Sequence, residues 1–199
     1  RALAACEGVL LVVDATQGIE AQTLANLYLA LESNLVIIPV VNKIDLPSAR
    51  ADEVAEDLSK LLGINSSDVI FISAKLGTNV NQILQAIIER IPPPRGKKED
   101  HLQALVFDSH YDSYKGVIAY VRIFDGSLSS MDMLQVMSNQ INFKPIELGI
   151  FQPGMVQVPS LEVGDVGYIA TGLKTVRECR VGDTITEAKA PAAHPMHAY

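Results

Sequence analysis

The residues best suited to chemistry follow the apolar run 35–41, in the order Asn42, Lys43, Ile44 and Asp45. A carboxylate accepts two hydrogen bonds at once. Guanine presents its N1–H and N2–H₂ donors side by side, whereas adenine has no such pair at that edge. An aspartate in the plane of the base therefore selects guanine, through charge-assisted hydrogen bonds of about 1.5–3 kcal/mol each. We predict that Asp45 performs this selection.

The neighbours of Asp45 fit the same chemistry. Lys43 can lay its four-carbon stem along one face of the base while its ammonium stays near water. Asn42 carries both a donor and an acceptor, which suffice to brace the loop and to touch the edge of the base, and Ile44 is expected to pack inward. Taken alone, these four residues could equally form a solvated turn at a strand end, and this structural interpretation stays open.

A second polar segment, Ser73-Ala74-Lys75, follows the apolar run 69–73. A small residue here lets the backbone approach a planar ligand closely. We expect the backbone N–H of Ala74 to donate to guanine O6, which adenine replaces with an amino group, and Lys75 to cover the second face of the base. The segment is weak evidence alone, but together with Asn42–Asp45 it favours a guanine site.

Three apolar runs that favour buried β-strands alternate with three amphipathic stretches that favour helices. The runs cover residues 8–15, 35–41 and 69–73, and the stretches cover residues 20–34, 50–62 and 80–91. This alternation predicts a parallel sheet with right-handed crossovers, hence an α/β domain over residues 1–91. Such sheets bind ligands at the carboxyl ends of their strands, which is where both polar segments lie.

The chain changes character at residues 92–101, where three prolines precede a charged cluster. Consecutive prolines favour a stiff, extended chain, so this stretch is the predicted linker. Beyond it, six short strands separated by turn residues predict an all-β domain over residues 102–190, a closed barrel. The expected strands cover residues 102–108, 116–124, 133–138, 144–150, 166–170 and 183–186. Residues 191–199 are expected to lead toward a further domain.

Composition narrows the class of protein. The chain has 199 residues, with 16 Lys and Arg against 23 Asp and Glu, for a net charge of −7. This balance argues against a protein that grips nucleic acid by charge alone. With 48% apolar residues the chain can bury a core, and its apolar runs are far shorter than the roughly 20 residues of a membrane span. Cys6 and Cys179 are too few for a disulfide scaffold and are predicted to be buried thiols.

The segment around His110 offers another candidate site, because Asp108 and Asp112 flank this histidine. The three side chains could form an acid–base set, but a turn in which the aspartates cap backbone N–H groups is the favoured interpretation. Tyr111 and Tyr114 could then contact RNA or protein, or they could pack at the mouth of the barrel.

Histidines supply the only hint of a metal site. His194 and His197 are spaced like a pair of metal ligands, but no third ligand lies near them in the sequence. His101 falls in the predicted linker, where we expect it to be solvated. We therefore predict no metal site in this chain.

Residues 42–45 and 73–75 resemble the two guanine-specificity motifs of translational GTPases, and residues 14–23 resemble the strand and helix that precede them. In the second half, residues 105–117, 166–169 and 181–186 resemble the barrel domain of the LepA family, also called elongation factor 4. The resemblance covers nearly the whole chain. It implies a P-loop GTPase-like domain, present in part, followed by a translation-factor barrel. The nucleotide-binding residues that it implies are Asn42, Lys43, Ile44, Asp45, Ser73, Ala74 and Lys75.

The resemblance also implies a function. Such a protein is a ribosome-dependent GTP hydrolase that acts in translation elongation, as a back-translocation or fidelity factor. GTP or GDP with Mg²⁺ would be its cofactors, and the ribosome, through rRNA and ribosomal proteins, would be its partner, with tRNA contacted indirectly. A monomer in the bacterial cytoplasm is expected. Peripheral attachment to the cytoplasmic face of the membrane, and a mitochondrial or plastid origin, stay open.

Two motifs of such an enzyme are missing from this sequence. A GTPase needs a Gly-x4-Gly-Lys-Ser/Thr loop that cradles the phosphates, and this family has an Asp-x-x-Gly-His motif that holds Mg²⁺. We therefore expect a fragment, the C-terminal half of a G domain plus the barrel, with no catalytic residues, metal ligands or GTPase activity of its own. Two alternatives are another translational GTPase of the elongation factor G type and a non-enzymatic ribosome- or RNA-binding module.

Overall fold

The computed structural model describes residues 2–196 of the chain. These residues form two compact units. One unit is the segment Cys6–Pro93, and the other is the chain from Pro94 onward together with the short 3-10 helix η1 (Ala2–Ala5). The division falls within the proline run, whereas the finer limits of the linker at 92–101 stay predictions.

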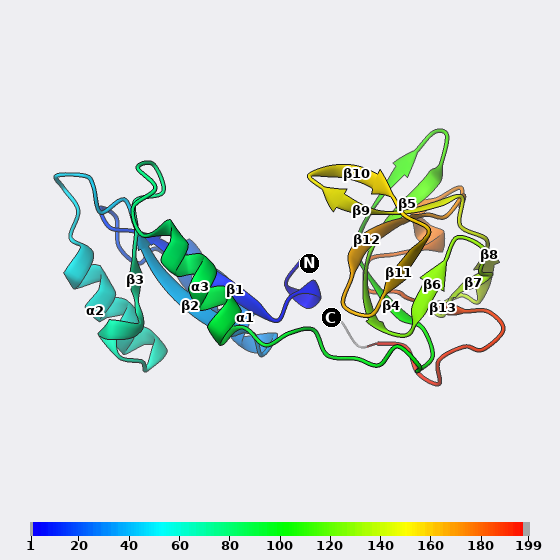
Figure 1. Cartoon of the computed structure of the whole chain (residues 1–199), viewed down its shortest axis with the longest axis horizontal. Helices are drawn as coiled ribbons and strands as arrows, with labels where there is room; N and C mark the ends of the chain where they lie inside the picture. Colours follow the sequence, from blue (N-terminus) through cyan, green and yellow to red (C-terminus); the bar gives the residue numbers. More distant parts are fainter. Residues whose placement is uncertain (1, 197–199) are drawn as a thin grey trace. The chain divides into compact units, whose positions relative to one another are not determined.

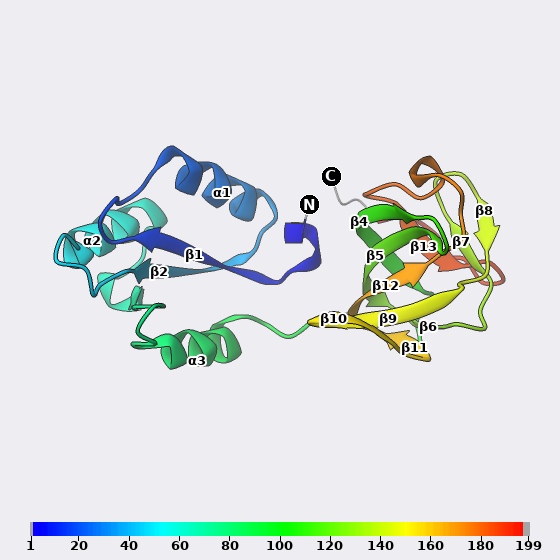
Figure 2. The same ribbon diagram turned by 90° about the horizontal axis from the view of Figure 1, so that it is seen from above.

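The first unit is a three-stranded parallel sheet with helices on both faces, and its strands follow one another in the order β1-β2-β3 (Figure 1). Its elements are β1 (Gly8–Asp14), α1 (Ala21–Glu32), β2 (Val36–Asn42), α2 (Ala51–Leu62), the 3-10 helix η2 (Ser66–Asp68), β3 (Ile70–Phe71) and α3 (Val80–Arg90). Helices α1 and α3 lie on opposite sides of the sheet (Figure 2). The predicted α/β architecture is confirmed.

The apolar side chains of β2 pack against helices on both faces of the sheet. Val41 packs with Leu27 of α1 and Leu58 of α2, whereas Ile38 packs with Ile83 of α3. A strand sends successive side chains to opposite faces, so a continuous apolar run serves two helical layers. The result is a rigid frame beneath the loops that follow each strand.

The end of β3 comes earlier than the sequence predicts. The prediction placed a strand over residues 69–73, but only Ile70–Phe71 pair as a strand. Ile72 N–H still donates to the Val41 carbonyl at 2.8 Å, while Ser73 N–H donates to Thr78 at 3.2 Å and turns the chain into a loop. The polar segment therefore begins in a tight turn.

The second unit is all-β and barrel-like. Eight of its strands form an antiparallel sheet in the order β10-β9-β12-β5-β4-β13-β7-β8, and β11 and β6 form a second, small sheet. Its elements are β4 (Gln103–Asp112), β5 (Gly116–Asp125), β6 (Ser127–Ser129), β7 (Leu134–Val136), β8 (Ile141–Phe143), β9 (Glu147–Gln152), β10 (Gly154–Gln157), β11 (Ser160–Glu162), β12 (Val166–Ala170), η3 (Val176–Glu178) and β13 (Thr184–Glu187). Both sheets share one core, since Leu128 of β6 and Leu161 of β11 pack with residues of the large sheet.

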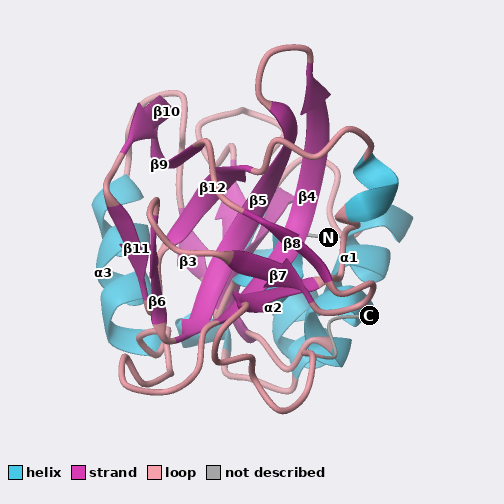
Figure 3. Cartoon of the chain, turned by 90° about the vertical axis from the view of Figure 1, so that its right-hand side faces the viewer, coloured by secondary structure: helices cyan, strands magenta, loops and turns pink. Residues whose placement is uncertain are grey.

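The predicted strands of this unit are present, but four others were missed. Strands β6, β8, β10 and β11 have only three or four residues each and lie outside the runs that the sequence pattern marked as strands. Strands β4 and β5 also run further than predicted and form a long hairpin that ends in the turn between Asp112 and Gly116 (Figure 3).

The two cysteines lie in different surroundings. Cys179 is buried, as predicted, but Cys6 is exposed, which corrects the prediction of two buried thiols. Cys6 lies between η1 and β1, outside the packed cores. Within residues 2–196, no helix is long and apolar enough to cross a membrane.

Candidate functional site

The ends of three strands bring the polar segments together. In the parallel register Asp14, the last residue of β1, lies opposite Asn42, the last residue of β2. The Asn42 Oδ1 atom accepts two hydrogen bonds, from Lys43 N–H at 2.8 Å and from Ala74 N–H at 3.0 Å. One amide oxygen therefore joins the loop after β2 to the loop after β3, which is the bracing role that the sequence predicts for Asn42.

The backbone at Lys43 adopts an uncommon conformation. Its φ is 67°, in the left-handed region that side chains other than glycine seldom adopt. The Asn42 amide oxygen holds the Lys43 N–H in this turn, and Ile44 N–H donates to the Ile72 carbonyl at 3.3 Å. Ile44 packs against the core under α1 and α2, as predicted, so the turn directs its neighbours outward.

A hollow lies between these loops, with a volume of about 180 Å³. Its lining consists of Asn42, Lys43, Asp45, Leu46 and Lys75. It thus combines a carboxylate, an amide, two long lysine stems and an apolar side chain, which are groups able to bind a polar planar ring.

Three of the seven predicted residues do not line this hollow. Ile44 packs inward, and Ser73 is 1% exposed, with its Oγ accepting a hydrogen bond from Leu76 N–H at 3.2 Å. Ala74 is exposed, but its N–H is engaged by Asn42 in this structure. Ser73 therefore shapes the turn, and any contact of Ala74 with a ligand has to compete with the Asn42 amide.

Asp14 adds a charge that the sequence analysis did not assign to the site. Its Oδ2 atom lies 2.5 Å from Lys43 Nζ. Its Oδ1 atom accepts hydrogen bonds from Thr16 N–H at 2.8 Å and Thr16 Oγ1 at 2.7 Å. The hydrogen bond from Lys43, followed by those from Thr16, lowers the pKa of Asp14 from 3.8 to about 2. Its place at the carboxyl end of a buried strand was the signal that could have revealed it.

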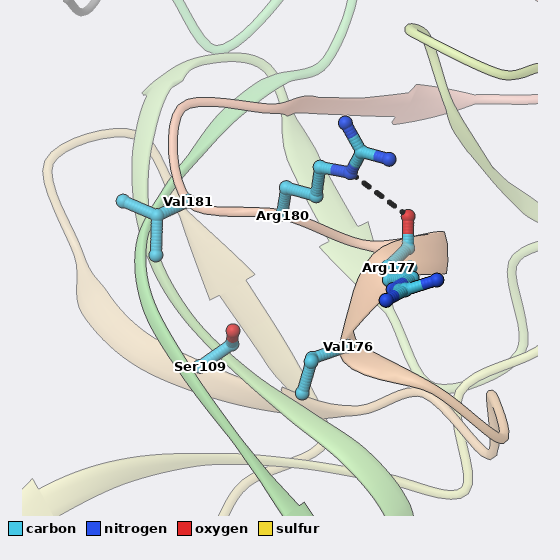
Figure 4. A pocket seen from close by; sticks show the side chains of 5 residues that line it. All are labelled: Ser109, Val176, Arg177, Arg180 and Val181. Carbon is cyan, nitrogen blue, oxygen red and sulfur yellow. Dashed lines mark hydrogen bonds between the residues drawn. The ribbon is translucent and has the colours of Figure 1, made fainter.

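The second unit has a larger hollow, with a volume of about 360 Å³ (Figure 4). Its lining consists of Ser109, Val176, Arg177, Arg180 and Val181. Arg180 Nε donates a hydrogen bond to the Arg177 carbonyl at 3.2 Å, which helps to orient the Arg180 guanidinium group. Two arginines beside a hydroxyl group suit an anion, because a guanidinium group donates in a planar fork.

The β4–β5 turn is built by aspartate capping. Asp112 Oδ1 accepts hydrogen bonds from Tyr114 N–H and Lys115 N–H, both at 2.8 Å. These two bonds are the main reason that the pKa of Asp112 lies below its ordinary value. The geometry supports the turn interpretation over an acid–base set. Tyr111 and Tyr114 project from this hairpin with 56% and 93% of their surface exposed.

Metal ligands do not gather in the part of the chain that the structure describes, where no three His, Cys, Asp or Glu side chains could hold an ion together. The ring of His194 belongs to no such group among the described residues. The His194 backbone carbonyl accepts a hydrogen bond from Gln103 Nε2 at 2.8 Å. His197, and with it the end of the predicted segment 191–199, lies outside the described residues.

Known proteins resemble the chain over its whole length. Residues 1–93 match the family model of the elongation factor Tu GTP binding domain. All 199 residues align at 53% identity with elongation factor 4 of Clostridium tetani and at 52% with elongation factor 4 of Synechocystis sp.. The chain spans 33% of the length of each of these relatives.

Solved structures of low sequence identity share the fold. Translation elongation factor SelB from Methanococcus maripaludis, in its apo form, has a TM-score of 0.78 at 21% identity, over 92% of this chain and 40% of SelB. The bacterial selenocysteine-specific elongation factor EF-Sec has a TM-score of 0.75 at 20% identity, over 93% of this chain and 32% of that protein. Each alignment covers most of both units of this chain.

Proposed function

The chain belongs to the elongation factor 4 (LepA) family, and from this premise we propose that it supplies guanine recognition to a ribosome-dependent GTPase of translation elongation. The parent protein would hydrolyse GTP and act as a back-translocation or fidelity factor. One observation carries the proposal for this chain: the hollow that Asn42, Lys43, Asp45 and Lys75 line at the carboxyl end of a parallel sheet.

Asp45 is the group that distinguishes bases in this proposal. Its carboxylate is exposed at the hollow and would accept hydrogen bonds from guanine N1–H and N2–H₂. The stems of Lys43 and Lys75 would cover the two faces of the ring, since long lysine stems pack on flat apolar surfaces while their ammonium groups stay solvated. Adenine would leave the Asp45 carboxylate facing a ring edge without the donor pair.

The Ala74 N–H is the proposed donor to guanine O6. Because it already donates to Asn42 Oδ1 at 3.0 Å, O6 would share this hydrogen in a three-centre bond or displace the Asn42 oxygen. Sharing keeps the two loops joined while the base is bound. Ser73, buried under this turn, would hold the Ala74 backbone in place.

Phosphates and Mg²⁺ belong to the parent protein in this proposal. The described residues contain no group of three metal-binding side chains, so we assign no metal ligand to them. Mg²⁺ would supply charge neutralisation at the phosphates, and this chain would contribute base binding alone.

The ribosome is the proposed partner of the second unit. Exposed Tyr111 and Tyr114 could stack on unpaired bases, and Arg177 and Arg180 could pair with backbone phosphates. Contact with tRNA would be indirect, the chain itself would be monomeric, and the parent would be cytoplasmic, with or without peripheral membrane attachment. Arg177→Ala should weaken ribosome binding by the parent and reduce its salt dependence. An unchanged salt slope would remove this arginine from the interface.

Ribosome-stimulated hydrolysis by the full-length parent tests the proposed function. We expect the rate of GTP hydrolysis to rise when ribosomes are added and ATP not to be hydrolysed. At subsaturating GTP, Asp45→Ala should lower the rate at least tenfold. Asp57→Ala, which removes an exposed carboxylate from α2, is the matched control and should leave turnover unchanged. Equal use of GTP and ATP would favour the structural-turn interpretation.

The isolated chain should show no turnover, because its sequence contains no Gly-x4-Gly-Lys-Ser/Thr loop to cradle the phosphates. We expect no phosphate release above background from the purified 199-residue chain. Hydrolysis that persisted through purification and disappeared in Asp45→Ala would overturn this part of the proposal.

A further inference from the structure

Asp14 has a place in the site that none of the predicted roles explains. It ends β1, and the parallel register sets it opposite Asn42, the residue before Lys43. This register brings the Asp14 carboxylate to the Lys43 ammonium across two neighbouring strands, with Nζ and Oδ2 separated by 2.5 Å. The contact joins a residue beside the hollow to a residue of its wall.

The Asp14 carboxylate is itself held in one orientation. Thr16 donates to Oδ1 twice, through its backbone N–H and its hydroxyl group. The Asp14 side chain is only 14% exposed, and Oδ2 is left to face Lys43. An acceptor fixed in this way gives the long lysine side chain a single anchor point.

Lys43 is constrained at both ends. Its backbone is fixed in the left-handed turn by the bond to Asn42 Oδ1, and its ammonium is fixed by Asp14. The stem between these points lines the hollow. A free lysine side chain loses many rotamers when a ligand packs on it, and this loss weakens binding.

We propose that Asp14 is a positioning residue, which anchors the Lys43 ammonium so that the lysine stem forms a preset wall for the guanine base. The inference rests on the proposed function, because it assigns a role within the same base site. Asp14 touches no part of the base. Because Asp14 already holds the Lys43 side chain in place, that side chain loses little further rotamer freedom when the base binds.

A lysine–carboxylate pair on α2 shows what a pair without this anchoring looks like. Lys60 Nζ lies 3.8 Å from Glu56 Oε2, and the two side chains are 72% and 68% exposed. No hydroxyl group fixes that carboxylate in the described structure. Glu56→Gln is therefore a matched control, which removes one charge from the same unit without touching the hollow.

The test measures binding of fluorescent GDP and ADP to the full-length parent and to its Asp14→Asn, Lys43→Ala and double variants. We expect Asp14→Asn to weaken GDP binding about tenfold, because one long side chain is no longer held in place before the base binds. The affinity for ADP should not change. The double variant should bind GDP no more weakly than Lys43→Ala, because Asp14 acts only through Lys43. Glu56→Gln should bind GDP like the wild type.

Each outcome separates this inference from the function on which it rests. If the wild type prefers GDP but Asp14→Asn binds it equally well, the positioning role is wrong and the guanine site stands. If Asp14→Asn binds GDP and ADP more tightly, the released ammonium acts as a charge and the role is also wrong. A wild type that does not distinguish GDP from ADP overturns both.

A second readout avoids dependence on variants that unfold. In the wild-type chain, the ¹⁵N-labelled ammonium of Lys43 should exchange protons with water more slowly than that of Lys60, since Asp14 holds it. Equal exchange at Lys43 and Lys60 would overturn the anchoring.

Discussion

Two lysine–carboxylate pairs, one in each unit, share their geometry and differ in their surroundings. Lys43 Nζ lies 2.5 Å from Asp14 Oδ2, and Lys115 Nζ lies 2.7 Å from Glu147 Oε2. In both pairs the carboxylate is the less exposed partner, at 14% for Asp14 and 16% for Glu147. The ion pairs alone would not distinguish the one beside the proposed base site from the other.

A hydroxyl group completes each arrangement. Thr16 Oγ1 donates to Asp14 at 2.7 Å, and the Tyr168 hydroxyl donates to Glu147 at 2.5 Å. Tyr168 is 1% exposed and packs with Ile118 and Ala170 in a small cluster apart from the main barrel core. Burial, followed by the bond to Glu147, raises the pKa of Tyr168 to about 12. Thr16 instead sits on a loop after β1.

The difference lies in what adjoins the lysine. Lys43 lines a hollow with a second carboxylate, Asp45, and a second lysine, Lys75. Lys115 lies in the β4–β5 turn and reaches β9, where it ties two segments of one sheet together. One ion pair therefore lies at the wall of the proposed base site, and the other joins two segments of a packed sheet.

The largest expected effect falls on the packed face. Gly149→Ala would place a methyl group onto the Tyr168 ring, and because that ring is buried it cannot move aside. We expect the barrel unit to lose about 3 kcal/mol of unfolding free energy, measured by urea denaturation. Gly154→Ala, which meets nothing within 4 Å, is the control. Equal stability of the two variants would show that Tyr168 is loosely packed.

Removal of the carboxylate from the same network should have a smaller effect. Glu147→Ala leaves the buried Tyr168 hydroxyl without its acceptor, which costs about 2 kcal/mol of stability, and it should not alter GDP binding by the parent. Glu99→Ala, which removes an exposed carboxylate from the same unit, is the control and should leave the unfolding free energy nearly unchanged. A loss of GDP affinity in Glu147→Ala would contradict the division between a binding pair and a structural pair.

Acid should weaken both pairs. A carboxylate whose pKa is lower in the folded state contributes stability above its ordinary pKa and loses that contribution as the pH falls through the lowered value. For Asp14 this window runs from 3.8 down to about 2, and the pKa of Glu147 is also lowered, chiefly by Lys115 and then Tyr168. Carboxyl ¹³C titration should place the Asp14 midpoint near 2. A midpoint at 3.8 or above would mean that Lys43 does not hold it.

The smallest effect is expected at the exposed helical pair. Lys60→Met removes the partner of Glu56 on α2, where both side chains are largely exposed. We expect a change of about 0.5 kcal/mol or less in unfolding free energy, since such pairs are screened by water. A loss above about 1 kcal/mol would show that exposure does not separate the three pairs.

Patterns of buried side chains could be predicted from the sequence, and they located the strand ends that carry the candidate site. The runs that became β1 and β2 lie within a residue of their predicted limits. The bracing by Asn42 and the inward packing of Ile44 also followed from residue type. The short strands β6 and β8 were not predicted, because their pairing partners rather than their own patterns define them, whereas β7, equally short, falls within the predicted run 133–138.

Contacts between separate segments were the part that residue types could not reveal. The pairing of Asp14 with Lys43 depends on the register of β1 against β2. The engagement of Ala74 N–H by Asn42 depends on two loops that are 32 residues apart. Exposure of Cys6 likewise depends on its place between η1 and β1, and cysteine composition carries no signal for it.

Exchange of the purine base tests guanine recognition most directly. Asp45→Asn in the full-length parent keeps one acceptor and gains a donor, which clashes with guanine N2–H₂ and matches the C2 carbonyl of xanthine. Competition between GDP and xanthosine diphosphate should show a wild type that prefers GDP and a variant that prefers the xanthosine nucleotide. A variant that keeps the GDP preference of the wild type would contradict the assignment of Asp45 as the residue that selects guanine.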